Sequence, residues 1–147
     1  DSTLGLMTGK NTMAYNTYSN GGNHVSTTAS GHTQYYTQLA SNGTTYIGEF
    51  VENTFPFRLK VSKLYMDSIV NLVHWIPFQM VLLGSNDDGV TYDHIASIGN
   101  GINSPAAYNI AITSTESYFK IKLICTKASS RQTFFMQFYK IYGSIYA

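Results

Sequence analysis

Three separate stretches of the chain combine aromatic rings with side chains that exchange hydrogen bonds. They contain His32, Gln34, Tyr35 and Tyr36 in the first, Asn71, His74 and Trp75 in the second, and Arg131, Gln132 and Phe134 in the third. Protein sites for neutral sugars use this combination, because an aromatic ring covers the apolar C–H face of a sugar while Asn, His and Arg pair with its hydroxyl groups. The sequence therefore predicts a ligand site assembled from three segments.

Some of these aromatic residues have a structural interpretation besides ligand binding. Trp75 is the single tryptophan of the chain, and a lone Trp in a β-rich domain fills a core as readily as it lines a binding surface. Tyr35 and Tyr36 are adjacent, so one of the two rings faces outward if they lie on a strand. We expect an exposed ring at this pair, and both roles stay open for Trp75.

The acidic residues give no catalytic arrangement. A hydrolase needs a paired acid and base or an activated nucleophile, but Asp and Glu total only eight. Glu49 and Glu52 have opposite parity on one predicted strand and so face opposite ways, and Asp87 and Asp88 serve a turn. The sequence also lacks the Gly-x-Ser-x-Gly, His-x-x-x-His, phosphate-loop and Cys-pair motifs. We expect no enzyme activity and no cofactor.

Metal binding is not indicated by the histidines or the cysteine. The four histidines lie on separate segments without ligand spacing: His24, His32, His74 and His94. We expect each to be a surface or hydrogen-bonded residue and expect no metal site. The single cysteine, Cys125, follows a strand-like apolar run, which predicts a buried thiol that packs as a small hydrophobe.

Length and composition indicate one β-rich domain over residues 1–147. Charged residues are only 12% of the chain, while Tyr, Thr, Ser, Asn and Gly are abundant. This balance argues against disorder and against a helical bundle, and it favours a neutral polar surface of the kind found outside cells or on particles. Lys and Arg are scattered rather than clustered along the sequence, so no nucleic-acid partner is expected. Without a signal peptide at Asp1, we expect a mature fragment or an excised domain.

Short strands must position the candidate residues. Alternation of apolar and polar residues predicts two antiparallel strands at 46–57 and 58–67, connected at Pro56. Residues 1–23 form an irregular first strand and a loop in this interpretation. We expect further strands at 108–113, 118–126 and 134–145, the last with a bulge, and loops at 24–43, 68–77, 99–105 and 128–132. Many short strands separated by turns predict an all-β, antiparallel β-sandwich.

The clearest local signal is a hairpin at residues 78–95. An apolar run ends at Gly84-Ser85-Asn86-Asp87-Asp88-Gly89, where Asn and Asp can bond the local backbone and Gly can take positive φ. The stretch from Leu82 to Tyr92 resembles the central hairpin of discoidin, or coagulation factor 5/8 type C, domains. Flanking pieces at 46–64 and 140–143 fit the same order. The likeness is closest to divergent forms in large DNA viruses, phage fibres and bacterial surface proteins.

The resemblance implies a galactose-binding-domain-like jelly roll of about eight strands with a binding site on its loops. Its ligand-binding residues would be His32, Tyr35, Tyr36, Asn71, His74, Trp75, Arg131 and Phe134. Many members hold a structural calcium ion, but Ser19-Asn20 and Tyr139-Lys140 stand where acidic ligands would be needed, so no calcium is expected.

Three kinds of partner follow from the resemblance. The first is a glycan or glycoprotein receptor, bound by a module that attaches a viral, phage or extracellular assembly to a surface. The alternative is a structural or decoration domain whose apolar segment at 69–75 contacts another protein, within a parent fibre, capsid or surface protein that could be a homotrimer. Insertion of that segment into phospholipid, as in coagulation members, is disfavoured because no collar of Lys or Arg surrounds it. An extracellular or virion-surface location is expected.

Overall fold

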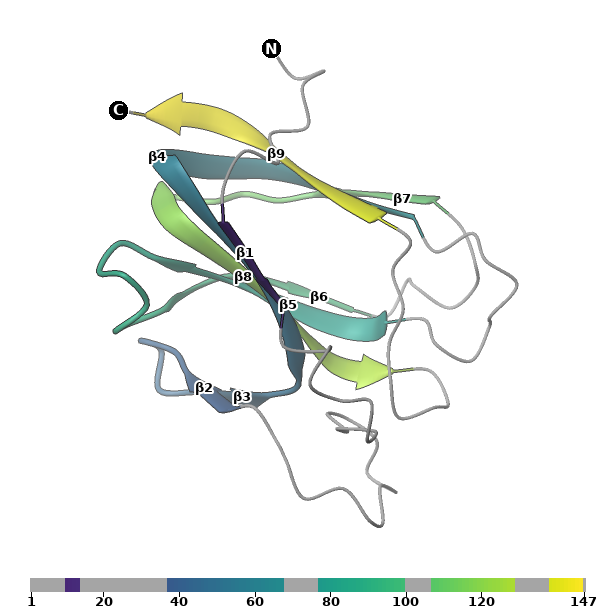
Figure 1. Cartoon of the computed structure of the whole chain (residues 1–147). Helices are drawn as coiled ribbons and strands as arrows, with labels where there is room; N and C mark the ends of the chain where they lie inside the picture. Colours follow the sequence, from purple (N-terminus) through teal and green to yellow (C-terminus); the bar gives the residue numbers. More distant parts are fainter. Residues whose placement is uncertain (1–9, 14–36, 68–76, 100–106, 129–137, 147) are drawn as a thin grey trace.

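The chain folds as an all-β sandwich in which strand β4 belongs to both layers (Figure 1). The computed structural model describes residues 10–13, 37–67, 77–99, 107–128 and 138–146. Nine strands lie in these ranges: β1 (Lys10–Met13), β2 (Thr37–Leu39), β3 (Thr45–Ile47), β4 (Glu49–Asp67), β5 (Pro77–Ser85), β6 (Asp93–Ile98), β7 (Ala107–Ala111), β8 (Tyr118–Ala128) and β9 (Phe138–Tyr146). The predicted antiparallel β-sandwich is confirmed.

Strand β4 connects the layers because its two halves pair with different strands. The first half pairs with β1 on one side and β8 on the other, and β8 continues through β5 to β6. The second half pairs with β7 and β9. All of these pairings are antiparallel, and Figure 1 shows the layer of β4, β7 and β9 above that of β8, β5 and β6.

The prediction of two strands joined at Pro56 was wrong, because β4 is one continuous strand. Its register with β8 is interrupted between Thr54 and Leu59, on either side of Pro56. Proline removes a backbone donor and so breaks the ladder, but its fixed φ allows an extended chain. The expected alternation of buried and exposed residues does hold across the bend. The result is a strand that bends from one layer into the other.

The bulge predicted in the last strand was placed on the wrong strand. Gly143 lies opposite Val61 and Tyr142 lies opposite Lys63, so Ser62 is the additional residue and the bulge is in β4, the partner of β9. The predicted central hairpin is present, formed by β5 and β6. Its turn contains two residues with positive φ, Asp88 at 59° and Gly89 at 88°.

The main core lies between the two layers. It is formed by inward-facing side chains that alternate with outward-facing ones along β4, β5, β8 and β9. Its buried members include Val51, Leu59, Val61, Leu64, Met66, Met80, Leu82, Ile121, Leu123, Tyr139 and Ile141. Cys125 belongs to this cluster and is 1% exposed, as predicted for a buried thiol.

A second, smaller core lies on the outer side of the β5–β8 layer. There the hairpin of β2 and β3 and the loop before β6 pack on Val81, Leu83 and Ile124. The chain turns back sharply at Gly48, where a Cβ atom would overlap the carbonyl oxygen of Cys125. A glycine is therefore required where the hairpin folds over the sheet.

Candidate functional site

Three loops of the chain start and finish at the same end of the sandwich. In the sheet register, Asp67 lies opposite both Ala107 and Phe138, and Pro77 lies opposite Ala128. The strand ends that flank residues 68–76, 100–106 and 129–137 therefore lie at one end of the sandwich, as Figure 1 shows for β4, β7, β8 and β9. The second and third predicted stretches fall within these ranges of the sequence.

None of the eight predicted ligand-binding residues lies in the described part of the chain. His32, Tyr35 and Tyr36 precede β2, Asn71, His74 and Trp75 fall between β4 and β5, and Arg131 and Phe134 fall between β8 and β9. Their role in a ligand site stays a prediction.

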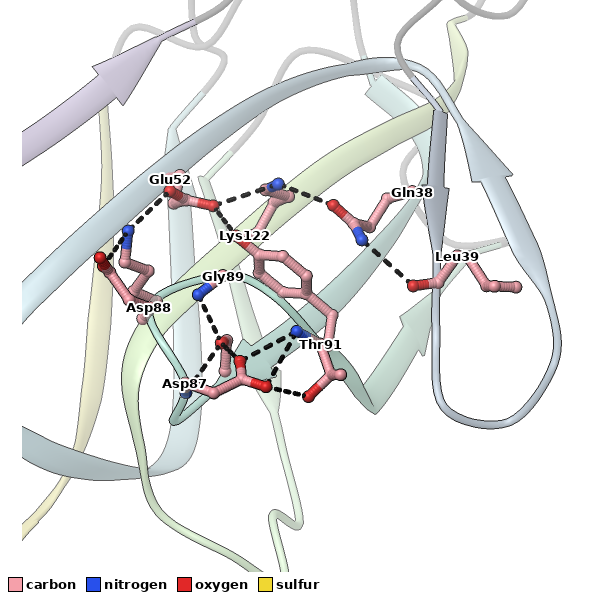
Figure 2. Close-up of polar contacts among 11 residues, drawn as sticks. Gln38, Leu39, Glu52, Asp87, Asp88, Gly89, Thr91 and Lys122 are labelled. Carbon is pink, nitrogen blue, oxygen red and sulfur yellow. Dashed lines mark hydrogen bonds and ion pairs between the residues drawn. The ribbon is translucent and has the colours of Figure 1, made fainter.

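Within the described residues, the densest polar arrangement is centred on Glu52 of β4 and Lys122 of β8 (Figure 2). The Glu52 Oε2 and Lys122 Nζ atoms are 3.1 Å apart, and both side chains are about nine-tenths buried. The two residues lie directly opposite each other in the sheet. They face the second core because Phe50 and Ile124, two positions away on the same strands, face it as well.

Further polar groups complete this cluster, which we call the Glu52 network. Lys122 Nζ donates to Gln38 Oε1 of β2 at 2.9 Å, and Lys120 Nζ lies 2.9 Å from Asp88 Oδ1 and 3.7 Å from Glu52 Oε1. The network thus joins four parts of the chain: β2, β4, β8 and the turn of the central hairpin.

Aromatic rings enclose the Lys122 ammonium group. Its Nζ atom is 4.1 Å from the centroid of the Tyr92 ring and 4.6 Å from that of Phe50. The Tyr92 hydroxyl donates to Glu52 Oε2. Burial raises the pKa of Tyr92, and the bond to the Glu52 carboxylate raises it further. Burial lowers the pKa of Lys122, while Glu52 opposes that shift.

The Glu52 network is suited to holding structure together rather than to catalysis. The Glu52 carboxylate already accepts from Tyr92 and pairs with two ammonium groups, and the Lys122 ammonium is enclosed by an amide, a carboxylate and two rings. A general base needs access to a substrate proton, whereas these contacts shield the carboxylate. The network fastens the β2–β3 hairpin and the Asp88 turn to the sheet.

Sequence reasoning missed the Glu52 network, although a signal for it exists. Glu52 follows Phe50 by two residues and Lys122 precedes Ile124 by two, so each charge shares a strand face with an apolar side chain. A charge on an apolar face needs a partner of opposite sign. The pairing of β4 with β8 supplies it, and that pairing is not visible in either segment alone.

Asp87 serves the central turn as predicted, whereas Asp88 has a second role. Asp87 accepts from the Thr91 backbone nitrogen at 2.9 Å and from the Thr91 hydroxyl at 2.6 Å, and it also accepts from the Ser85 hydroxyl. These bonds, with Thr91 first, lower the pKa of Asp87 from 3.8 to about 2. Asp88 takes positive φ in the turn, and its carboxylate pairs with Lys120 of β8.

His94 is the one histidine that lies within the described residues. Its ring stacks on Tyr46 with 6.0 Å between centroids, and its Nε2 atom lies 2.9 Å from the Ser97 hydroxyl. The prediction of a hydrogen-bonded histidine is confirmed for His94.

Across the described ranges, no group of three or more His, Cys, Asp or Glu side chains is placed to hold a metal ion. The same ranges contain no helix long and apolar enough to span a membrane.

Comparison with known proteins establishes the fold. Neither a protein-family model nor a curated protein matches the chain. Among solved structures, it is similar to the C-terminal domain of a chitobiase from Bacteroides fragilis, with a TM-score of 0.62 and 12% identity over 98% of this chain and 99% of that one. This chain and the chitobiase domain share the galactose-binding-like jelly-roll fold.

A second similarity is to the CBM32-1 and CBM32-2 domains of Clostridium perfringens ZmpB. One structure of these domains, in complex with GalNAc, matches with a TM-score of 0.57 and 12% identity, covering 92% of this chain and 39% of that one. A second structure of these domains matches with a TM-score of 0.54 and 13% identity, over 92% and 41% of the two chains. The architecture expected from the discoidin resemblance is thus confirmed at the level of the jelly roll.

Proposed function

We propose that the chain is a non-catalytic carbohydrate-binding module whose site lies on the loops at one end of the jelly roll. The observation that carries the proposal is that the strand ends flanking residues 68–76, 100–106 and 129–137 lie together at that end. Similarity to CBM32 domains, one structure of which is a complex with GalNAc, supports the same kind of ligand. Two of these three ranges of the sequence contain aromatic and polar residues of the type that sugar sites use.

The proposed roles follow from the chemistry of each side chain. Trp75, Tyr36 and Phe134 supply rings that cover the apolar face of a sugar, and His74 and Arg131 exchange hydrogen bonds with its hydroxyl groups. The remaining members, His32, Tyr35 and Asn71, line the same site in the proposal. In its biological setting, the module attaches an extracellular, viral or phage assembly to a glycan-bearing surface, and within a fibre it would stand as one of three copies.

The test is a glycan array probed with the intact chain and with the Trp75→Ala and Tyr36→Ala variants. Phe119→Ala is the matched control, because this ring is 38% exposed and follows the first residue of β8, whereas the proposed site lies beyond the other end of that strand. Selective binding that both loop variants lose and the control retains would support the proposal, with circular dichroism confirming that each variant folds. No binding on the array, or equal loss in the control, would overturn it.

A structural domain that contacts another protein is the second candidate, and one observation favours it. Leu39 and Ile47 are 61% and 44% exposed and face outward from the β2–β3 hairpin. Exposed apolar side chains on a small sheet are typical of protein contacts. A Leu39→Ser/Ile47→Ser variant that leaves glycan binding intact but disrupts assembly of the parent particle would support this candidate. An array signal that depends on Trp75 would favour the first.

A further inference from the structure

The outer surface of β4 and β9 carries a row of cations and tyrosines. Facing pairs along the two strands are Arg58 with Tyr146, Lys60 with Ser144, Lys63 with Tyr142, and Tyr65 with Lys140. The residues between them on the same strands, Leu59, Val61, Leu64, Met66, Tyr139 and Ile141, are buried in the main core. Since side chains alternate along a strand, the paired residues all face away from that core. We call this surface the Lys–Tyr face.

Two ammonium groups on the Lys–Tyr face lie over tyrosine rings of the neighbouring strand. Lys63 Nζ is 4.0 Å from the centroid of the Tyr142 ring, and Lys140 Nζ is 5.9 Å from that of Tyr65. Both distances are within the range of cation–π attraction. The rings therefore orient the ammonium groups and reduce the entropy that a ligand would otherwise have to remove.

The sheet gathers charges that are separated in the sequence. Four of the nine Lys and Arg residues lie on the Lys–Tyr face, although they come from positions as far apart as 58 and 140 in the sequence. The acids with described side chains lie elsewhere: Glu52 in the first half of β4, Asp87, Asp88 and Asp93 at the central hairpin, and Glu116 before β8. Asp67 occupies the last register position of the row.

The side of this surface next to β7 carries small side chains. Ala111 and Asn109 lie opposite Lys63 and Tyr65 on the other edge of β4, and both are exposed. Small side chains beside a row of long ones leave space for an extended chain to lie along the sheet. The facing positions on β9 repeat every second residue, so neighbouring pairs of the row are about 7 Å apart along the strands.

We propose that the Lys–Tyr face binds an acidic polysaccharide, with its carboxylate or sulfate groups on Lys60 and Lys63 and its hydroxyl groups on Tyr142 and Tyr146. Charge complementarity favours an anionic ligand, and a repeating polymer matches a repeating row of cations. Tyrosine hydroxyls donate and accept hydrogen bonds, which suits the hydroxyl groups of sugars. The face lies on the side of the sandwich and not on its loops, so the proposal is independent of the loop site.

A single-stranded nucleic acid fits the Lys–Tyr face less well. Proteins that hold such strands present open aromatic rings on which bases stack. Here the Tyr142 ring carries the Lys63 ammonium group, so that side of the ring is occupied. The chain also has a formal net charge of only +1, which is low for a protein whose affinity depends on phosphate contacts.

The experiment measures binding of the full chain to labelled heparin oligosaccharide and to polygalacturonate by fluorescence anisotropy, at low salt where surface charges are weakly screened. Dextran is the uncharged control and oligothymidylate is the nucleic-acid probe. We expect both acidic polymers to bind and to dissociate as salt is raised. The Lys60→Gln/Lys63→Gln variant should bind on the order of tenfold more weakly, because it removes two exposed charge contacts with the polymer.

The matched control is Lys10→Gln/Lys127→Gln, which removes the same charge from β1 and β8. It should bind within about twofold of the parent chain, and Lys60→Arg/Lys63→Arg should retain binding. Tyr142→Leu should weaken binding without a change in charge, because it removes the ring that orients Lys63. Equal loss in the two Gln variants, absence of binding to both acidic polymers, or tighter binding of oligothymidylate would overturn the proposal.

Discussion

Two surfaces of the sandwich use lysine in opposite ways. Lys120 and Lys122, on the outer side of β8, are closed in by Glu52, Asp88 and the β2–β3 hairpin. On the Lys–Tyr face, Lys63 instead lies over the Tyr142 ring on the outward side of its strand. The comparison indicates that a covering hairpin with its acids makes a lysine part of the fold, whereas a lysine over a ring on an outward strand face is placed to meet a ligand.

Replacing the enclosed lysine should produce the largest effect. In Lys122→Met, Glu52 keeps a buried negative charge and loses its nearest ammonium group, so the free energy of unfolding should fall by about 3 kcal/mol. Urea denaturation measures this change. The double variant Glu52→Leu/Lys122→Met should recover much of the loss, because an apolar pair leaves no buried charge. A double variant less stable than Lys122→Met would contradict the assignment of Glu52 as its main partner.

Removing the Tyr92 hydroxyl should have an intermediate effect. Tyr92→Phe keeps the ring beside Lys122 and removes only the donor to Glu52, so the free energy of unfolding should fall by about 1–2 kcal/mol. Because Lys122 and Lys120 still pair with Glu52, the loss should be smaller than for Lys122→Met. Tyr46→Phe is a control on the adjacent hairpin, since its hydroxyl accepts only from the exposed Asn42 amide among the contacts described. A larger loss in the control would count against the network.

Acid should remove the contribution of the Asp87 carboxylate to the stability of the central turn. The folded state lowers the pKa of Asp87 from 3.8 to about 2, so this carboxylate stabilises the fold above pH 3.8 and its contribution is lost as pH falls through about 2. The Asp87→Asn variant should therefore melt below the parent chain at pH 6, and the difference should disappear near pH 2. Thermal unfolding followed by circular dichroism at several pH values measures this. A constant difference would exclude the carboxylate as its cause.

Replacing a lysine of the open face should change stability least. Lys63→Met loses one cation–π contact on a solvent-facing surface, which corresponds to less than about 1 kcal/mol of unfolding free energy. The same chemical change at position 122 is expected to cost several times more. Parallel urea titrations of Lys63→Met and Lys122→Met compare the two surfaces directly, and equal losses would refute the contrast between them.

Local patterns predicted the elements of the fold but not the surfaces that pairing creates. The central hairpin, the strand containing Cys125 and the buried alternation of β4 follow from neighbouring residues. The Glu52 network and the Lys–Tyr face depend on which strands lie side by side and on the bulge at Ser62, which places Lys63 opposite Tyr142. The eight loop residues predicted for the ligand site stay untested, because they lie outside the described ranges.

The sharing of β4 between layers has a consequence for the order of folding. Its partners β1, β7, β8 and β9 come from distant parts of the chain, and contacts of this kind slow folding because long loops must close first. Strand β9 is the last described strand to leave a ribosome, yet it completes both the main core and the row of tyrosines. The Lys–Tyr face is therefore among the last surfaces of the domain to form during synthesis.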